Sequence, residues 1–191
     1  MRGHRQFVLG CLVLALLPGG FTVMSATPVP SVVGNKSSDS NQTVRVRLLA
    51  PDGTLTAPTN VARVTRSDEE WRRRLAPEVY RVTRRAGTEP PFCGGFLREK
   101  RAGFFTCAGC GLPLFTSSAK FESGTGWPSF FEPAAPENVA ARPDRSLVST
   151  RTEILCARCG AHLGHVFDDG PRPTGRRYCL NAAALAFAHT P

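Results

Sequence analysis

Four of the seven cysteines form two matched pairs whose spacing could hold a metal ion. Cys107-Ala-Gly-Cys110 and Cys156-Ala-Arg-Cys159 share the CxxC pattern, and a glycine follows each pair. The tight turn of such a knuckle directs backbone N–H groups at the sulfurs, and two knuckles together supply a tetrahedral set of thiolates. The sequence therefore predicts one zinc site with the ligands Cys107, Cys110, Cys156 and Cys159.

Redox-active CxxC pairs and disulfides are the competing interpretations of these knuckles, and an oxidising compartment would favour either. The matched spacing and the two trailing glycines favour metal. Residues 111–155 separate the knuckles, a longer interval than the roughly 15–20 residues of an ordinary zinc ribbon. Because four thiolates leave no open coordination position, we expect a structural zinc ion that clamps a domain built elsewhere.

Cys93 and Cys179 remain once the knuckles and Cys11, which lies in the N-terminal segment, are set aside. A nucleophile with its resolving partner, two inert buried thiols, or one structural disulfide would each fit this pair by count and spacing.

The neighbours of Cys179 suit thiol chemistry. Arg176 and Arg177 precede it and favour a thiolate, while His162 and His165 could supply a proton to a leaving oxygen. Either histidine taken alone is more often structural. A Cys/His zinc site is disfavoured because the knuckle thiolates already saturate one ion.

Short aromatic and β-branched runs between glycine and proline clusters predict a mainly β domain. The runs lie at 103–106, 151–155 and 183–187. A helix is expected to begin at the cap Ser67 or Asp68, to carry Trp71 and Leu75 on one face, and to end near Pro77, with a second short helical turn over 80–84. Alternating polarity over 44–65 predicts a hairpin.

The N-terminus has the composition of a targeting signal. A cationic start precedes the apolar run 7–17, and Pro18-Gly19-Gly20 breaks that run before the small residues Ser25 and Ala26. The expected organisation is a signal peptide over 1–26, a linker with a possible β-hairpin extension over 27–66, and the main domain over 67–189. The protein would then be exported, to the periplasm or outside the cell, with an uncleaved membrane anchor as the alternative.

The chain has 191 residues and a net charge of +9, a balance that could attract nucleic acid or acidic proteins. Its basic residues are scattered rather than interleaved with aromatic residues along a strand, so no nucleic-acid partner is expected. A zinc-stabilised binding module without catalysis is the remaining alternative. Its mark would be loss of Cys179 or Asn181, and both residues are present.

Residues 67–188 resemble the methionine sulfoxide reductase B family. The resemblance lies in a series of blocks in family order: Gly87-Thr-Glu-Pro-Pro-Phe92, the first knuckle, Lys120-Phe-Glu-Ser-Gly-Thr-Gly-Trp-Pro-Ser-Phe130, Arg151-Thr-Glu153, the second knuckle, His162-Leu-Gly-His-Val-Phe167, Gly170-Pro171 and Arg177-Tyr-Cys-Leu-Asn181.

This resemblance implies two antiparallel sheets with short helices and a Cys₄ zinc site, and reduction of methionine R-sulfoxide in oxidised proteins. Cys179 would attack the sulfoxide sulfur, and His165 and Asn181, with His162, would position and protonate the departing oxygen. The resulting sulfenic acid is reversible. The substrate-binding residues would be Trp127, whose indole packs on the substrate methyl group, Phe130 and Arg177.

Two departures from the family pattern concern the later steps. Many relatives carry their resolving cysteine where this chain has Thr125, so Cys93 is expected to form the disulfide, which a thioredoxin-like dithiol would reduce. Residues 147–149 also replace a His-Gly-Met-like stretch, and a missing histidine there could lower activity or change substrate preference. We expect a monomer.

Overall fold

A computed structural model describes residues 42–146 and 149–189. The expected signal at 1–26 and most of the departure at 147–149 lie outside these residues. Within them, no helix is both long and apolar enough to cross a bilayer.

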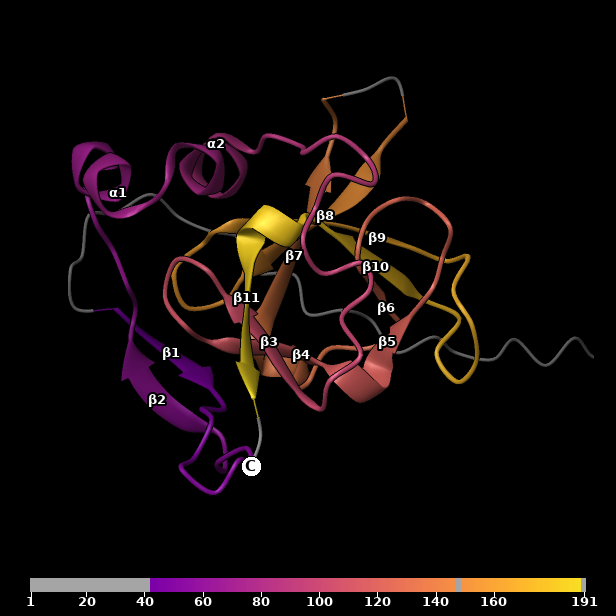
Figure 1. The fold of residues 1–191 in the computed structure, drawn as a ribbon. Helices are drawn as coiled ribbons and strands as arrows, with labels where there is room; N and C mark the ends of the chain where they lie inside the picture. Colours follow the sequence, from indigo (N-terminus) through magenta and orange to yellow (C-terminus); the bar gives the residue numbers. More distant parts are fainter. Residues whose placement is uncertain (1–41, 147–148, 190–191) are drawn as a thin grey trace, which may run out of the picture.

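Eleven strands in three antiparallel sheets and two short helices make up the described chain (Figure 1). The elements are β1 (Thr43–Val46), β2 (Thr59–Ala62), α1 (Asp68–Arg74), α2 (Pro77–Arg85), β3 (Gly103–Cys107), β4 (Pro113–Thr116), β5 (Lys120–Phe121), β6 (Ser129–Phe130), β7 (Val139–Asp144), β8 (Arg151–Cys156), β9 (His162–Phe167), β10 (Arg177–Leu180) and β11 (Leu185–His189), with 3₁₀ turns η1 (Ser117–Ala119), η2 (Pro136–Asn138) and η3 (Ala182–Ala184). The mainly β prediction is confirmed.

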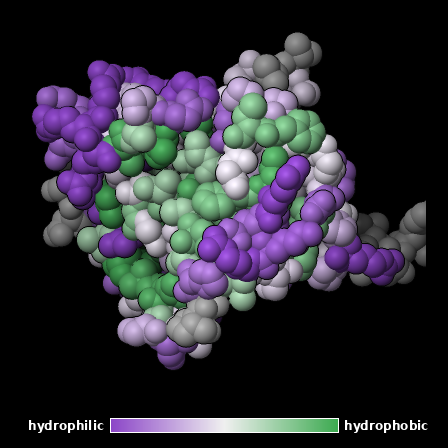
Figure 2. Space-filling view, viewed as in Figure 1, coloured by the Kyte–Doolittle hydropathy of each residue, from purple (hydrophilic) through white to green (hydrophobic). Residues whose placement is uncertain are grey.

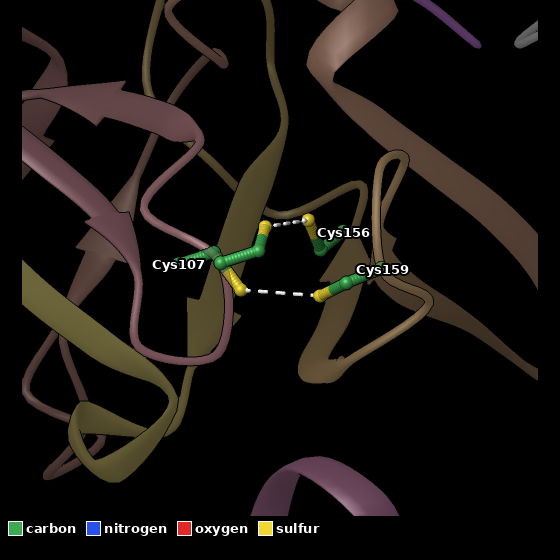
Figure 3. Close-up of side chains that lie close together, drawn as sticks. Cys107, Cys156 and Cys159 are labelled. Atoms are coloured by element: carbon green, nitrogen blue, oxygen red, sulfur yellow. Dashed lines mark hydrogen bonds between the residues drawn. The ribbon is translucent and has the colours of Figure 1, made fainter. Parts of the chain in front are cut away.

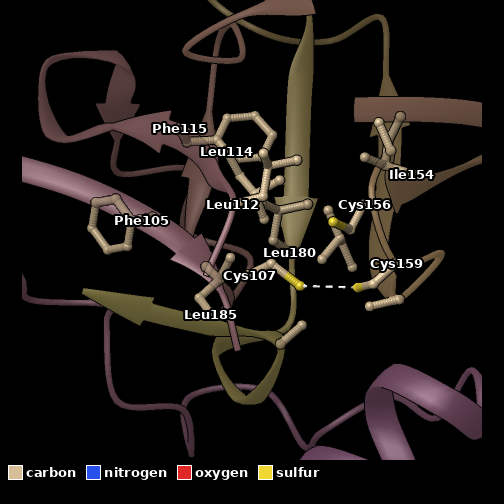
Figure 4. Close-up of a cluster of buried hydrophobic side chains, with 14 of the residues drawn as sticks. Phe105, Cys107, Leu112, Leu114, Phe115, Ile154, Cys156, Cys159, Leu180 and Leu185 are labelled. Carbon is tan, nitrogen blue, oxygen red and sulfur yellow. Dashed lines mark hydrogen bonds between the residues drawn. The ribbon is translucent and has the colours of Figure 1, made fainter. Parts of the chain in front are cut away.

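The two larger sheets enclose the core. One has the order β5-β6-β10-β9-β8-β7 and the other the order β11-β3-β4. Phe105, Phe115 and Phe130 are fully buried between them, and Phe130 lies 4.9 Å from Phe105 and 4.7 Å from Phe115 between ring centroids. Figure 4 shows how this aromatic cluster continues through leucines to the knuckle cysteines. Burying such rings is a main favourable contribution to folding, so the core fixes how the two sheets meet.

The third sheet is the β1–β2 hairpin, joined to the domain by a buried amide. Asn138 is fully buried and its side chain accepts from the Arg47 N–H at 2.8 Å and donates to the Arg47 carbonyl at 2.8 Å. The same amide donates to the Pro113 carbonyl at 2.7 Å. Because Val46 is also fully buried, this hairpin packs on the domain through its first strand.

The first helix begins and ends where the sequence predicts. Ser67 caps α1 in a capping box with Glu70, and Leu75 ends it. Proline in the first turn of α2 suits its fixed φ. The second helix is longer than the short turn expected, and it packs on β9 and η3. Figure 2 shows hydrophilic side chains gathered over α1 and α2.

The strand predictions were confirmed at 103–106 and 151–155, but 183–187 begins too early. Residues 182–184 form η3, and β11 starts at Leu185. β7 was not predicted from the sequence; it runs through Pro143 and pairs with β8 along its whole length. A proline is tolerated there because β7 is an edge strand.

Candidate functional site

Four cysteines from two separate turns converge in the described structure (Figure 3). Each knuckle contributes one member to each close pair. The Cys107 and Cys159 sulfurs lie 3.6 Å apart, and those of Cys110 and Cys156 lie 3.5 Å apart. These separations exceed a disulfide bond of about 2.05 Å. They match the roughly 3.8 Å between thiolates placed tetrahedrally at about 2.3 Å from a zinc ion.

The trailing glycines explain how each knuckle closes. Gly111 and Gly160 have φ of 73° and 67°, a conformation that side chains disfavour. In each turn the glycine N–H donates to the carbonyl of the first cysteine, at 2.8 Å to Cys107 and 2.9 Å to Cys156. The local sequence therefore forms each half of the cluster. All four sulfurs lie within 4.8 Å of one another, so the predicted metal-binding geometry is present.

The N-terminal helices cover this cluster. Trp71 is buried, and its ring lies close to Gly109 in the first knuckle. The Arg84 guanidinium stacks 4.5 Å from the Trp71 ring centroid and donates to the Cys159 carbonyl at 3.0 Å. The two helices therefore depend on the knuckles for part of their packing.

Cys179 lies in the middle of the six-stranded sheet, on β10. Its direct partner on β9 is His165, and its direct partner on β6 is Ser129. Residues paired directly across antiparallel strands point to the same face, with Cβ atoms about 4.5–5.5 Å apart. The strand register therefore brings His165 beside Cys179, although 13 positions separate them in the sequence.

Each histidine near Cys179 is held by a carboxylate. His165 Nε2 lies 2.8 Å from Asp144 Oδ2, and His162 Nδ1 lies 2.6 Å from Glu153 Oε1. An ionised carboxylate only accepts, so each contacted ring nitrogen carries the proton. The two rings meet edge-on with centroids 5.6 Å apart.

The two histidines differ in environment. Burial lowers the pKa of His165, with the hydrogen bond to Asp144 opposing that shift. The Asp144 carboxylate is held ionised, its pKa lowered chiefly by hydrogen bonds from Ser146 and then His165. His162 is only 4% exposed, and its Nε2 has no partner among the described residues. His165 can therefore stay neutral near pH 7 and donate a proton once it is charged.

Arg177 shares a strand face with Cys179, two positions away. Its guanidinium binds both Asp169 oxygens, at 2.9 and 2.8 Å, and lies 4.3 Å from the Phe167 ring centroid. The hydrogen bond to Asp169 is the main cause that raises the Arg177 pKa, and the nearby Cys179 charge adds to it. The guanidinium therefore places a positive charge near the Cys179 sulfur.

Hydroxyl groups approach Cys179 from the loop before β6. Thr125 Oγ1 lies 3.8 Å from Cys179 Sγ and 2.8 Å from Ser123 Oγ, which lies 2.7 Å from the buried Ser129 hydroxyl. Thr125 therefore contacts the Cys179 sulfur. It stands at the position where many relatives are expected to carry a resolving cysteine.

Trp127 lines a cavity of about 390 Å³ beside this loop. Apolar Phe92, Leu97 and Phe121 form other parts of its wall, together with cationic Arg98 and Lys120. Phe92 is 69% exposed. The cavity thus offers an aromatic surface next to the segment that contacts Cys179.

Cys93 lies in an exposed turn that touches both sides of the site. Its neighbour Phe92 donates a backbone hydrogen bond to the Gly126 carbonyl at 2.8 Å. Its other neighbour, Gly94, packs so closely that an added Cβ would lie 2.6 Å from Ala182 Cβ, three positions after Cys179. The turn therefore approaches Cys179 from the loop side and from the β10 side.

The remaining expected site residues are buried. The side chain of Asn181 accepts from the Glu89 N–H at 3.0 Å and donates to the Leu163 carbonyl at 3.1 Å. Phe130 lies in the core, on the opposite strand face from Ser129 and Cys179. It therefore supports the sheet beneath the site.

Three acidic residues around the site, Glu89, Glu153 and Asp144, were not predicted from the sequence. Glu89 and Glu153 lie inside the blocks that carry the resemblance. Both carboxylates are buried, at 6% and 4% exposure, and a buried carboxylate is normally paired with another polar or charged group. Asp144 lies in no such block. Only the pairing of β7 with β8 places it near β9, so no local pattern could have revealed it.

The SelR domain family matches residues 75–189. A protein of Hahella chejuensis named peptide methionine sulfoxide reductase MsrB is 56% identical over 125 residues, covering 65% of this chain and 90% of that protein. Proteins with the same name from Leifsonia xyli subsp. xyli and Methanosarcina barkeri are 58% and 52% identical over 65% of this chain and cover 90% and 87% of their own lengths.

Proposed function

The chain belongs to the SelR-domain family of B-type methionine sulfoxide reductases, and we propose that it reduces methionine R-sulfoxide in oxidised proteins with Cys179 as nucleophile. The observation that carries this proposal is the position of Cys179, which pairs directly with His165 on the neighbouring strand β9 and lies beside Thr125. A thiol, a proton donor and an aromatic surface for the substrate then lie on adjoining segments.

In the first step the Cys179 thiolate attacks the sulfoxide sulfur. Protonated His165, with His162 beside it, gives a proton to the departing oxygen. Arg177 places a positive charge beside the attacking sulfur. The oxygen then passes from the substrate sulfur to the Cys179 sulfur as the sulfur–sulfur bond formed in the attack breaks. The electron pair of that bond stays on methionine, which leaves, and Cys179 becomes a sulfenic acid.

In the second step Cys93 condenses with that sulfenic acid. The Cys93 sulfur bonds to the Cys179 sulfur, and the hydroxyl leaves as water with the thiol proton. An external dithiol of the thioredoxin type then reduces the disulfide. The contacts of Phe92 and Gly94 support this assignment because they hold the turn against both the Thr125 loop and η3.

Trp127 supports substrate recognition. Its indole lines the cavity and its Nε1 donates to the Glu89 carbonyl at 3.1 Å, which fixes the ring. A fixed ring offers apolar area to a methyl group without a further cost in rotamer freedom. The substrate methyl group would pack on this ring while the sulfoxide sulfur faces Cys179.

The metal at the four-cysteine cluster is proposed to be structural zinc. The cluster consists only of thiolates, which zinc accepts in tetrahedral sites without redox change. All four coordination positions are filled by the protein, so no substrate atom binds there. The ion would hold β3 and β8 together beneath α1 and α2.

Residues 1–26 support a further proposal, that the protein acts after export on oxidised envelope or secreted proteins. We also propose that it acts as a monomer. N-terminal sequencing of the exported fraction and light scattering test these two points. An uncleaved, membrane-associated chain would favour the anchor alternative.

The test of function is turnover of peptides that carry either epimer of methionine sulfoxide. With dithiothreitol the parent is expected to reduce only the R form, Cys179→Ser to be inactive, and Cys93→Ser to be active. With thioredoxin as reductant, Cys93→Ser is expected to fail. An inactive parent with its metal bound would contradict the proposal and favour a zinc-stabilised binding module.

A further inference from the structure

Glu89 is a buried carboxylate outside the residues used so far in the reaction. It is 6% exposed, and its two oxygens accept from the N–H groups of Ala182 and Ala183, at 2.6 and 2.9 Å. These N–H groups open η3, directly after the strand that carries Cys179. A buried carboxylate is costly unless it is hydrogen-bonded, so these contacts fix where Glu89 lies.

The backbone of Glu89 binds two side chains of the site. Its N–H donates to Asn181 Oδ1 at 3.0 Å, and its carbonyl accepts from Trp127 Nε1 at 3.1 Å. The carboxylate therefore anchors Glu89, and the backbone carbonyl of Glu89 orients the Trp127 indole that is proposed to bind substrate. Movement of Glu89 would move Trp127.

The turn with Cys93 packs on the same carboxylate. A Cβ added at Gly94 would lie 2.5 Å from Glu89 Oε1 and 2.6 Å from Ala182 Cβ. Cys93 is thus held between Gly94, which packs on Glu89, and Phe92, which bonds to Gly126. Short anchored segments keep the ends of a reacting pair at high effective concentration.

We propose that Glu89 is a positioning residue that sets both the Trp127 indole and the Cys93 turn relative to Cys179. This proposal rests on the proposed function. Glu89 therefore controls two separate quantities: the KM for the sulfoxide and the rate at which Cys93 displaces water from the Cys179 sulfenic acid to form the disulfide.

Glu89→Gln tests this role because an amide replaces one acceptor oxygen with an N–H donor that cannot accept from η3. With dithiothreitol, KM for the R-sulfoxide peptide is expected to rise about tenfold while kcat changes by less than about threefold. Glu89→Asp keeps both acceptor oxygens and is expected to show smaller effects than Glu89→Gln. Exposed Glu69→Gln in α1 is the control and should match the parent.

The second reaction step is measured without the sulfoxide. Hydrogen peroxide oxidises Cys179 to the sulfenic acid with release of water, and the loss of both thiols then reports disulfide formation. This rate is expected to fall about tenfold in Glu89→Gln. Since no methionine sulfoxide is present, this measurement tests Glu89 even if the parent fails to reduce the substrate.

Gly94→Ala displaces the Glu89 carboxylate without changing Glu89, and decides the matter if Glu89→Gln does not fold. Its added methyl group meets Glu89 and Ala182, whereas a Cβ at Gly95 meets nothing within 4 Å. Gly94→Ala is expected to raise KM and slow disulfide formation, and Gly95→Ala to do neither. Unchanged KM and disulfide rate in folded Glu89 and Gly94 variants, with only a lower melting temperature, would overturn the proposal.

Discussion

The four-cysteine cluster and the Cys179 site are assembled in different ways from the same side chain. Each half of the cluster is one turn, closed by a hydrogen bond from the Gly111 N–H to the Cys107 carbonyl or from the Gly160 N–H to the Cys156 carbonyl. The Cys179 site has no such local unit. Its partners come from β9, from the Thr125 loop and from the Cys93 turn.

The thiols also differ in access. Three of the four cluster cysteines, Cys107, Cys156 and Cys159, are buried and Cys110 is half-buried, whereas Cys179 is half-buried and Cys93 is exposed. Buried thiols held together are suited to retain a metal, and accessible thiols beside cations and imidazoles are suited to react. One part of the molecule is therefore suited to use cysteine for stability, and the other to use it for chemistry.

Removing one metal ligand should produce the largest effect and separate the two centres. Cys156→Ser is expected to lose the metal and to lower the free energy of unfolding by on the order of 5 kcal/mol, because the ion stabilises only the folded chain. Elemental analysis and thermal unfolding measure this. Cys93→Ser should keep both the metal and the melting temperature. Full metal content in Cys156→Ser would contradict the four-ligand cluster.

Moving the proposed resolving thiol should produce the next largest effect. Cys93→Ser is expected to lower thioredoxin-dependent turnover about a hundredfold, and adding Thr125→Cys to recover it to within about tenfold of the parent. The reason is that Thr125 Oγ1 already lies 3.8 Å from Cys179 Sγ. Ser118→Cys, at an exposed position, is the matched control and should recover nothing. If the two added cysteines rescue equally, proximity is not the cause.

The carboxylate behind His165 should set the pH dependence of the first step. Donation requires protonated imidazole, so methionine formation falls as pH rises through the His165 pKa. Burial lowers that pKa and Asp144 opposes the shift. Asp144→Asn should therefore move the falling limb to lower pH by about one unit. Single-turnover rates between about pH 5 and 9 measure it, with exposed Asp52→Asn as control. A limb moved to higher pH would assign the proton to another group.

The cation beside Cys179 should have the smallest effect of the four. Arg177→Lys keeps the charge but loses the two-point contact with Asp169, so kcat/KM is expected to fall about threefold to tenfold. Steady-state kinetics with dithiothreitol measure this change. Arg176→Lys alters the residue directly before β10 and should match the parent. Equal losses in both variants would mean that net charge, rather than the Arg177 geometry, matters.

Local patterns predicted the parts of this protein that local geometry builds. The cap Ser67 and the breaker Pro77 gave the limits of α1, and CxxCG spacing gave both knuckles. The edge strand β7 was not predicted because its alanine, arginine and proline residues do not alternate between apolar and polar as in a typical strand. Its conformation is fixed by pairing with β8. The start of β11 was predicted too early because the three alanines of η3 favour neither a strand nor a 3₁₀ turn.

The sequence by itself determined the cysteine inventory, the metal half-sites, the mainly β fold and, through its blocks, the resemblance to one family. Only the tertiary structure placed His165 opposite Cys179, Asp144 behind His165, and Glu89 between Trp127 and η3. The physical reason is that a turn or a cap is fixed by neighbouring residues. The alignment of distant strands is fixed by the register of the sheet and the core that it buries.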